Sequence, residues 1–232
     1  MRHANLPSRP LLALILPALG VALALAPDSW CIALEYSRDA LAAGEGRRLW
    51  TGHLVHFSTR HAGVDLATLL VFCAAIERRC GRRILLNRLL WIPPLLSLGL
   101  YFAVPELAVY RGASGLCVAF GVTLGLALWR ESRRLHPLLL LLAVLFAFKS
   151  ASEAAGFALD FAGLDGTVRV AWQAHWLGAL FALLFDGCLG RMFSRFVLIS
   201  ITARATNRIP AAAPRRQIQE NRDVVSPMRL LA

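Results

Sequence analysis

Ser114 is the side chain best suited to nucleophilic chemistry. It lies in Arg111-Gly112-Ala113-Ser114-Gly115, at the start of an apolar run. Glycines on either side let other backbone approach closely, and the amino terminus of a helix leaves N–H groups that can face a developing anion. The string alone is weak, because small residues also pack membrane helices. Catalysis and packing are therefore both open at this position.

His175 is a polar ring inside the last apolar run, in Ala174-His175-Trp176-Leu177-Gly178. A histidine within hydrogen-bond reach of a serine can take the serine proton and later return it to a leaving amine. The alternative is a buried histidine bonded to a neighbouring carbonyl. A polar group in such surroundings is costly, which favours a functional role.

Small residues could bring Ser114 and His175 together. In the last run they recur at four-residue spacing at Ala174, Gly178 and Ala182. The run that begins near Ser114 carries similar residues at Gly121 and Gly125, extended by Gly115 and Ala119. Such flat faces permit close helix contact. We therefore expect these two runs to cross closely.

A third polar cluster contains His56, His61 and Asp65. His61 and Asp65 are four residues apart and share one face of a helix. The three side chains could be metal ligands or could support an oxyanion. The nearby serine and histidine make oxyanion support the better account, so no metal and no cofactor are expected.

Composition indicates a membrane protein. Hydrophobic residues make up 57% of the 232-residue chain and its mean hydropathy is +0.58, whereas soluble domains are about 45–50% apolar. The predicted fold is an all-α, six-transmembrane-helix bundle. Several of its spans are shorter than the ~20 residues that cross a bilayer, which tilt or local thinning can accommodate. The apolar runs cover about 11–26, 55 or 61 to 76, 85–101, 113–129, 137–148 or slightly beyond, and 170–189.

The first run also resembles a signal peptide, because Arg2 and Arg9 precede it and small residues end it at Ala26. Pro27 follows at once and argues against cleavage there. We expect a retained first span.

Charge sets the expected orientation. The net charge is +11, and the segments that precede span one, join spans two to three and four to five, and follow span six are rich in arginine. The alternate links are balanced or slightly acidic, including the one with Lys149 and Glu153. The positive-inside rule then predicts cytoplasmic termini. Because the arginines follow the predicted membrane topology and no nucleic-acid-binding motif accompanies them, nucleic-acid binding is not expected.

The chain divides into two expected parts. Residues 1–190 form the expected membrane domain, and residues 191–232 form an expected basic, mobile cytoplasmic tail.

The joint pattern resembles the rhomboid intramembrane serine proteases over roughly residues 10–190. The shared features are Arg48-Leu49-Trp50-Thr51, His56-x4-His61-x3-Asp65, Gly112-x-Ser114-Gly115 and Ala174-His175-x-x-Gly178, in this order along the chain. The resemblance implies a nucleophilic Ser114 and a general base His175, as a dyad without a carboxylate. It implies that His56, position 65 and the Ser114 N–H surround the oxyanion, that His61 orders the second span, and that the site opens to the outer side.

Two positions depart from the common rhomboid pattern. Rhomboids usually have asparagine where this chain has Asp65, and many have a tyrosine where it has Val118. An aspartate donates a hydrogen bond only when protonated, which burial favours; otherwise His56 and the backbone carry the oxyanion alone.

Within that family, the chain resembles the rhombosortase branch. It shares its size, Gly52-His53-Leu54-Val55-His56, Asp65, Tyr110-Arg111-Gly112-Ala113-Ser114-Gly115, and Lys149 with Glu153. The resemblance implies a bacterial inner-membrane enzyme that processes exported, membrane-anchored proteins with a Gly-Gly motif, an apolar segment and a basic end. Lys149 and Glu153, four residues apart, are expected to pair with each other.

Two other function classes fit the sequence less well. A catalytically silent rhomboid-like binder or chaperone of membrane clients is supported by Asp65 and Val118, but the presence of both Ser114 and His175 argues against it. A transporter or channel lacks support, because the sequence shows no inverted repeat and no charged path through the spans.

Overall fold

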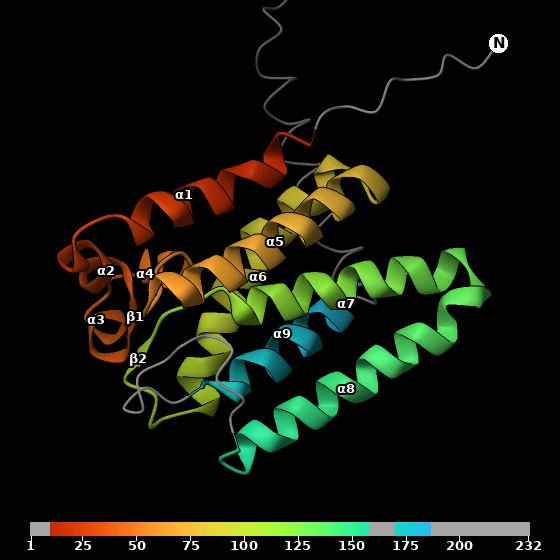
Figure 1. Ribbon diagram of the computed structural model, residues 1–232. Coiled ribbons are helices and arrows are strands. Elements are labelled where there is room, and N and C mark those ends of the chain that lie inside the picture. Colours follow the sequence, from red (N-terminus) through yellow and green to blue (C-terminus); the bar gives the residue numbers. More distant parts are fainter. Residues whose placement is uncertain (1–9, 158–169, 187–232) are drawn as a thin grey trace, which may run out of the picture. The chain divides into compact units, whose positions relative to one another are not determined.

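The computed structural model describes residues 10–157 and 170–186, and these residues form a largely helical structure (Figure 1). The expected tail at 191–232, Arg2 and Arg9, and the link residues 158–169 lie outside the described residues. The longer helices are α1 (Ile15–Ala24), α5 (Thr59–Arg79), α6 (Arg82–Ala103), α7 (Ser114–Glu131), α8 (His136–Ala154) and α9 (Trp172–Leu184). The shorter elements are η1 (Leu12–Leu14), α2 (Asp28–Leu34), β1 (Tyr36–Ser37), α3 (Arg38–Ala42), α4 (Arg48–Thr51), β2 (Val109–Tyr110) and η2 (Arg133–Leu135).

A helix lies at each of the six predicted apolar runs. Among the described residues, three helical segments are long and apolar enough to cross a membrane: Thr59–Arg79, Arg82–Ala103 and Arg133–Ala154. The segment Leu12–Ala24 is apolar but shorter. Several candidate spans are therefore present, as a helical membrane protein requires, and the count of six remains a prediction.

The fifth helix is longer than its hydropathy indicated. α8 continues through Lys149 and Glu153, which the sequence assigned to the following link. These residues lie four apart and form an ion pair, which supports a helical turn despite its polarity. The helix ends just before Gly156, whose φ of +88° suits a glycine.

The segment between α1 and α5 is folded, although the sequence marked it simply as a link. β1 pairs antiparallel with β2, and Tyr36 stands opposite Tyr110. Arg48 donates to the carbonyl oxygens of Ile32 at 2.9 Å and Glu35 at 2.8 Å. The strand pairing ties the outer segment to the strand that leads into α7, and the Arg48 bonds hold the outer segment together.

Trp50 attaches the same segment to α6. Pro94 has no N–H, so the carbonyl of Leu90 one turn earlier has no partner in its own helix. The indole N–H of Trp50 donates to this oxygen at 3.0 Å. A proline within a membrane helix is thus accommodated by a side chain from the outer segment.

α1 packs along α5. The backbone N–H of Ala13 donates to the buried carboxylate of Glu77 at 2.8 Å, which satisfies a donor at the start of the helix. Gly20 faces Leu66, and a Cβ there would lie 2.5 Å from a methyl group of that leucine.

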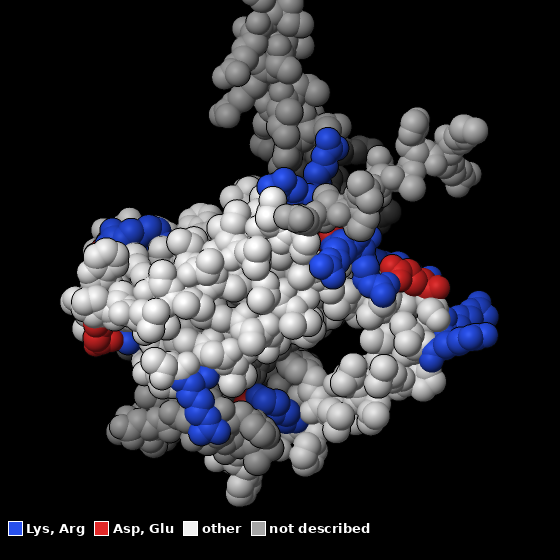
Figure 2. Space-filling model, turned by 45° about the horizontal axis from the view of Figure 1, so that its top comes forward, with Lys and Arg blue, Asp and Glu red and all other residues white. Residues whose placement is uncertain are grey.

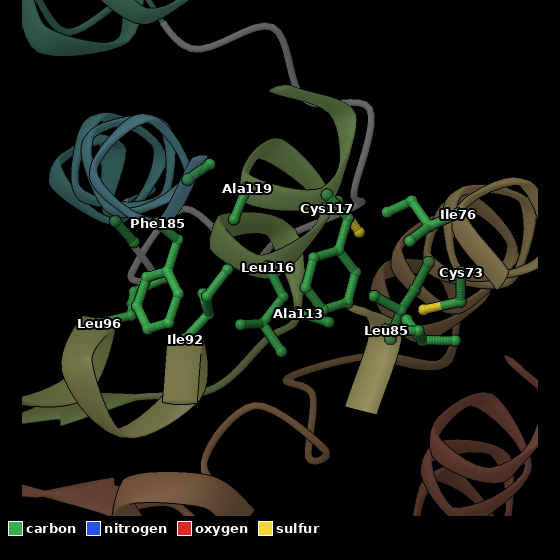
Figure 3. Close-up of a cluster of buried hydrophobic side chains, with 14 of the residues drawn as sticks. Cys73, Ile76, Leu85, Ile92, Leu96, Ala113, Leu116, Cys117, Ala119 and Phe185 are labelled. Carbon is green, nitrogen blue, oxygen red and sulfur yellow. The ribbon is translucent and has the colours of Figure 1, made fainter. Parts of the chain in front are cut away.

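The core lies between α5, α6, α7 and α9. Figure 3 shows the side chains of Ile76, Ile92, Leu116 and Phe185, among others, pointing toward one another from these elements. Ile76, Ile92 and Leu116 have no exposed surface. This packing fixes α7 and α9, which carry Ser114 and His175.

Charged side chains gather toward the ends of the helices. On the face shown in Figure 2, a broad uncharged surface separates groups of arginines. At one end, Asp186 binds Arg88 at 3.3 Å and Arg130 at 2.5 Å, joining α6, α7 and the residues after α9. The broad uncharged surface on this face suits a chain that spans lipid.

Candidate active site

The turn before Ser114 is held by backbone and side-chain contacts. Gly112 has a φ of +137°, which favours glycine. Its N–H donates to the carbonyl of Gly52 at 3.2 Å. A Cβ on Gly112 would lie 2.9 Å from Cε1 of His61 and 3.3 Å from Oδ2 of Asp65. A larger residue would therefore displace the polar cluster.

Asp65 accepts hydrogen bonds at the centre of this cluster. Its Oδ2 receives the N–H of Ala113 at 2.8 Å, which secures the residue immediately before Ser114. The Nε2 atoms of His56 and His61 lie 3.4 and 3.3 Å from the same oxygen. Asp65 thus accepts the Ala113 N–H, and the two histidine rings lie beside the same carboxylate oxygen. The geometry thus gives Asp65 a role in holding the turn, which the sequence did not predict.

The two histidines contact Asp65 alike. Their ring centroids are 5.0 Å apart and the rings are nearly perpendicular, at 89°. Neither Nδ1 has a hydrogen-bond partner among the described residues. The two rings therefore lie at similar distances from Asp65, and His61 is the nearer of the two to Gly112.

The metal alternative gains no support from this geometry. Within residues 10–157 and 170–186, no group of three or more His, Cys, Asp and Glu side chains has an arrangement that could hold a metal ion.

Arg111 links the turn to the outer segment. Its guanidinium binds Glu35 at 2.6 Å and Asp28 at 2.9 Å. It also lies over the ring of Phe57, 5.2 Å from the centroid. These contacts tie the residue before Gly112 to the outer segment.

His175 is buried near the start of α9, where α9 meets α7. The contact is backbone to backbone: a Cβ on Gly178 would lie 2.2 Å from the carbonyl oxygen of Gly115. A Cβ on Gly115 would lie 3.0 Å from the carbonyl oxygen of Ala174. Ser114 and His175 are the chain neighbours of Gly115 and Ala174, so the structure brings both predicted catalytic residues to one helix crossing.

The small residues of α7 do not all serve this crossing. Gly121 faces the ring of Phe72 on α5, and Gly125 faces Leu139 on α8. The prediction that these two glycines act with Gly115 and Ala119 is therefore wrong. They fall at a different phase of the helix, so they point to other neighbours.

Tyr110 approaches the predicted nucleophile. Its phenol lies beside the Ser114 side chain and the Gly115 backbone, and burial raises the pKa of Tyr110, which keeps the phenol protonated. Its ring meets that of His53 edge-on, at 5.6 Å between centroids. Tyr110 therefore adds a hydroxyl to the site that sequence reasoning did not assign.

His53 supports Tyr110 from the outer segment. Burial lowers the pKa of His53 to about 4, so its ring is neutral near pH 7. Its Nε2 lies 3.1 Å from the carbonyl oxygen of Pro93, which can only accept, so Nε2 carries the proton. The ring is thus a fixed part of the scaffold.

A family comparison agrees with this arrangement. A model of the rhomboid domain matches residues 43–192, well over half of the chain. The chain belongs to the rhomboid family. The match spans α4 to α9 and includes every residue of the polar cluster and the helix crossing. Rhomboid domains are helical membrane bundles, and the family is typically one of serine proteases that act on membrane proteins. No curated protein matches the chain.

Within this rhomboid domain, His175 has a neighbour that the sequence did not predict. Glu153 of α8 lies 3.2 Å from Nδ1 of His175, measured from Oε2. Its other oxygen binds Lys149, as the four-residue spacing predicted. A buried carboxylate 22 residues before the histidine gave no local signal of this contact, because the contact depends on how α8 packs against α9.

Proposed function

We propose that this rhomboid-family protein is an intramembrane serine endopeptidase in which Ser114 is the nucleophile and His175 the general base. The observation that carries the proposal is the crossing of α7 and α9, where the residues adjoining Ser114 and His175 are in backbone contact. Close approach of a serine and a histidine is what a two-residue nucleophilic site needs.

The reaction has two steps, the acylation of Ser114 and the hydrolysis of the acyl-enzyme. Oγ of Ser114 attacks the peptide carbonyl while His175 takes the hydroxyl proton. The intermediate collapses when His175 returns that proton to the leaving amine, which leaves an acyl-enzyme. Water then attacks the acyl carbonyl while His175 takes its proton, and His175 passes that proton to Oγ of Ser114 as the acid product leaves. N–H groups at the start of α7, with His56 or His61, are the nearest candidates to stabilise the oxyanion.

A fluorophosphonate probe tests the nucleophile without a known substrate. We expect the wild type to be labelled covalently, and Ser114→Ala to show no labelling, because the probe reacts with activated serines. His175→Ala should label at least ~10²-fold more slowly, since general-base assistance contributes about that much. The control is Ser152→Ala on α8, where the serine hydroxyl donates to the carbonyl of Phe148. Equal labelling of wild type and Ser114→Ala would contradict the proposal.

We further propose that the enzyme belongs to the rhombosortase branch and works in the bacterial inner membrane, with cytoplasmic termini and a site open to the periplasm. Three features support this: Asp65, the Tyr110–Gly115 stretch, and Lys149 with Glu153 near His175. The arginine-rich segments supply the orientation. The substrates would be exported proteins whose tails carry Gly-Gly, an apolar segment and a basic end.

A tail reporter tests the substrate class. An exported reporter protein with such a tail should be shortened when co-expressed with the wild type and should stay intact with Ser114→Ala. Replacing Gly-Gly with Val-Val should lower cleavage at least ~10-fold, because β-branched residues resist the close backbone approach that glycine permits. Immunoblotting of membrane fractions measures both. Equal cleavage of the two tails would remove the rhombosortase assignment and leave the protease proposal standing.

A further inference from the structure

Glu153 is the charged group that faces His175 from a different helix. Its Oε2 lies 3.2 Å from Nδ1 of His175, and Oε1 binds Nζ of Lys149. The Glu153 side chain is 3% exposed and that of His175 is 6% exposed, whereas Lys149 is 43% exposed. The carboxylate is therefore a buried bridge between an accessible ammonium group and the ring of His175.

This contact decides which nitrogen of the ring can act as a base. A carboxylate only accepts hydrogen bonds, so the nitrogen that faces it carries the proton. In the neutral ring, Nδ1–H then points at Glu153 and Nε2 has a free lone pair. A general base must present such a lone pair to the serine hydroxyl. Without the carboxylate, either tautomer would be open to His175.

The same contact stabilises the ring after it takes a proton. The imidazolium formed during attack then lies beside a negative charge in a largely water-free setting, where the attraction between charges is strong. Lys149 holds the second carboxylate oxygen and so fixes the direction of the first. Both effects act on His175, while Glu153 has no described contact with Ser114.

We propose that Glu153 is a positioning residue that fixes the tautomer and orientation of His175, so that the site is a serine–histidine–glutamate arrangement in place of the expected dyad. The inference rests on the proposed roles of Ser114 and His175. Buried carboxylates play this part for the histidine of serine proteases on unrelated folds. Here the carboxylate comes from the helix before the histidine and is itself held by a lysine.

The competing explanation is a structural bridge between α8 and α9. Glu77 provides a matched control, because it is also a buried glutamate that accepts a hydrogen bond, from Ala13, but it lies on the α1 side of α5. Replacing either glutamate with glutamine keeps the shape and removes the charge. A structural role predicts a similar loss of thermal stability in both variants and no specific loss of reactivity.

The test measures the rate of fluorophosphonate labelling in full-length protein in lipid vesicles, well below the unfolding temperature. We expect Glu153→Gln to slow labelling ~10²-fold, in the range of general-base effects, and Glu77→Gln to leave the rate within about twofold. Glu153→Asp keeps the charge and should label faster than Glu153→Gln. A Glu153→Gln rate equal to that of Glu77→Gln would overturn the inference while Ser114 stays the nucleophile. Labelling of Ser114→Ala at the wild-type rate would instead overturn the proposed function.

Discussion

Replacing Gly178 with alanine is expected to force α7 away from α9 and to slow cleavage strongly. The new Cβ would lie 2.2 Å from the carbonyl oxygen of Gly115. That atom belongs to a helix backbone and cannot move aside by a change of rotamer, so the crossing itself must open. We expect a loss of about 3 kcal/mol in unfolding free energy, at the upper end of overpacking effects. A displacement near 1 Å would also cost about 10²-fold in rate.

Gly63→Ala is the matched control for this substitution. Gly63 also lies within a helix, α5, but a Cβ there would meet no atom within 4 Å. Alanine at such a position should be neutral or raise stability by about 0.5–1 kcal/mol, because glycine is the poorer helix former. Thermal unfolding in detergent and fluorophosphonate labelling measure both variants. Equal behaviour of Gly178→Ala and Gly63→Ala would refute the close crossing.

Replacing Asp65 with alanine is expected to release the turn that carries Ser114. The substitution removes the acceptor of the Ala113 N–H and the carboxylate that lies beside both histidine rings. Leaving a buried donor without a partner costs about 1–3 kcal/mol for each group. Because the lost bond adjoins Ser114, we expect labelling to fall by about 10²-fold, similar to the loss of an oxyanion-hole donor.

Asp65→Asn separates the charge of this residue from its oxygen. The amide oxygen can still accept the Ala113 N–H, and asparagine is the residue that rhomboids commonly have there. We expect labelling within about tenfold of the wild type and stability well above that of Asp65→Ala. Asp39→Asn, at an exposed side chain on α3, is the control for removing an aspartate charge from the outer segment. If Asp65→Asn lost as much labelling and stability as Asp65→Ala, the negative charge itself would be required.

The sequence predicted the features that depend on local composition. Hydropathy located the helices, and the spacing of Ala174, Gly178 and Ala182 identified the face of α9 that meets α7. All three residues are buried. A buried helix face is visible in the sequence because residues three or four apart lie on the same side of a helix.

The remaining features depend on contacts between distant segments. The sequence predicts only the ion pair of Glu153 with Lys149. The contact of Glu153 with His175 also requires α8 to lie beside α9. Tyr110 reaches the site because two-residue strands pair it with Tyr36, and such short strands have no periodic signal. The sequence left open whether Asp65 donates to the oxyanion, whereas its observed hydrogen-bond partner is the backbone N–H of Ala113, which no sequence pattern reveals.

Because one side of α8 is exposed, the contact between Glu153 and His175 is easier to disturb than the crossing of α7 and α9. The side chains of Leu138, Leu141, Val144 and Leu145 are each more than half exposed, so in a bilayer acyl chains would contact this side of the helix. α7 and α9, in contrast, interlock at their backbones. A thinner, thicker or detergent-like surrounding should shift α8 before it disturbs that crossing. The carboxylate would then withdraw from His175 while the serine and histidine keep their places. The rate in such a protein would depend on its lipid surroundings even when its fold does not.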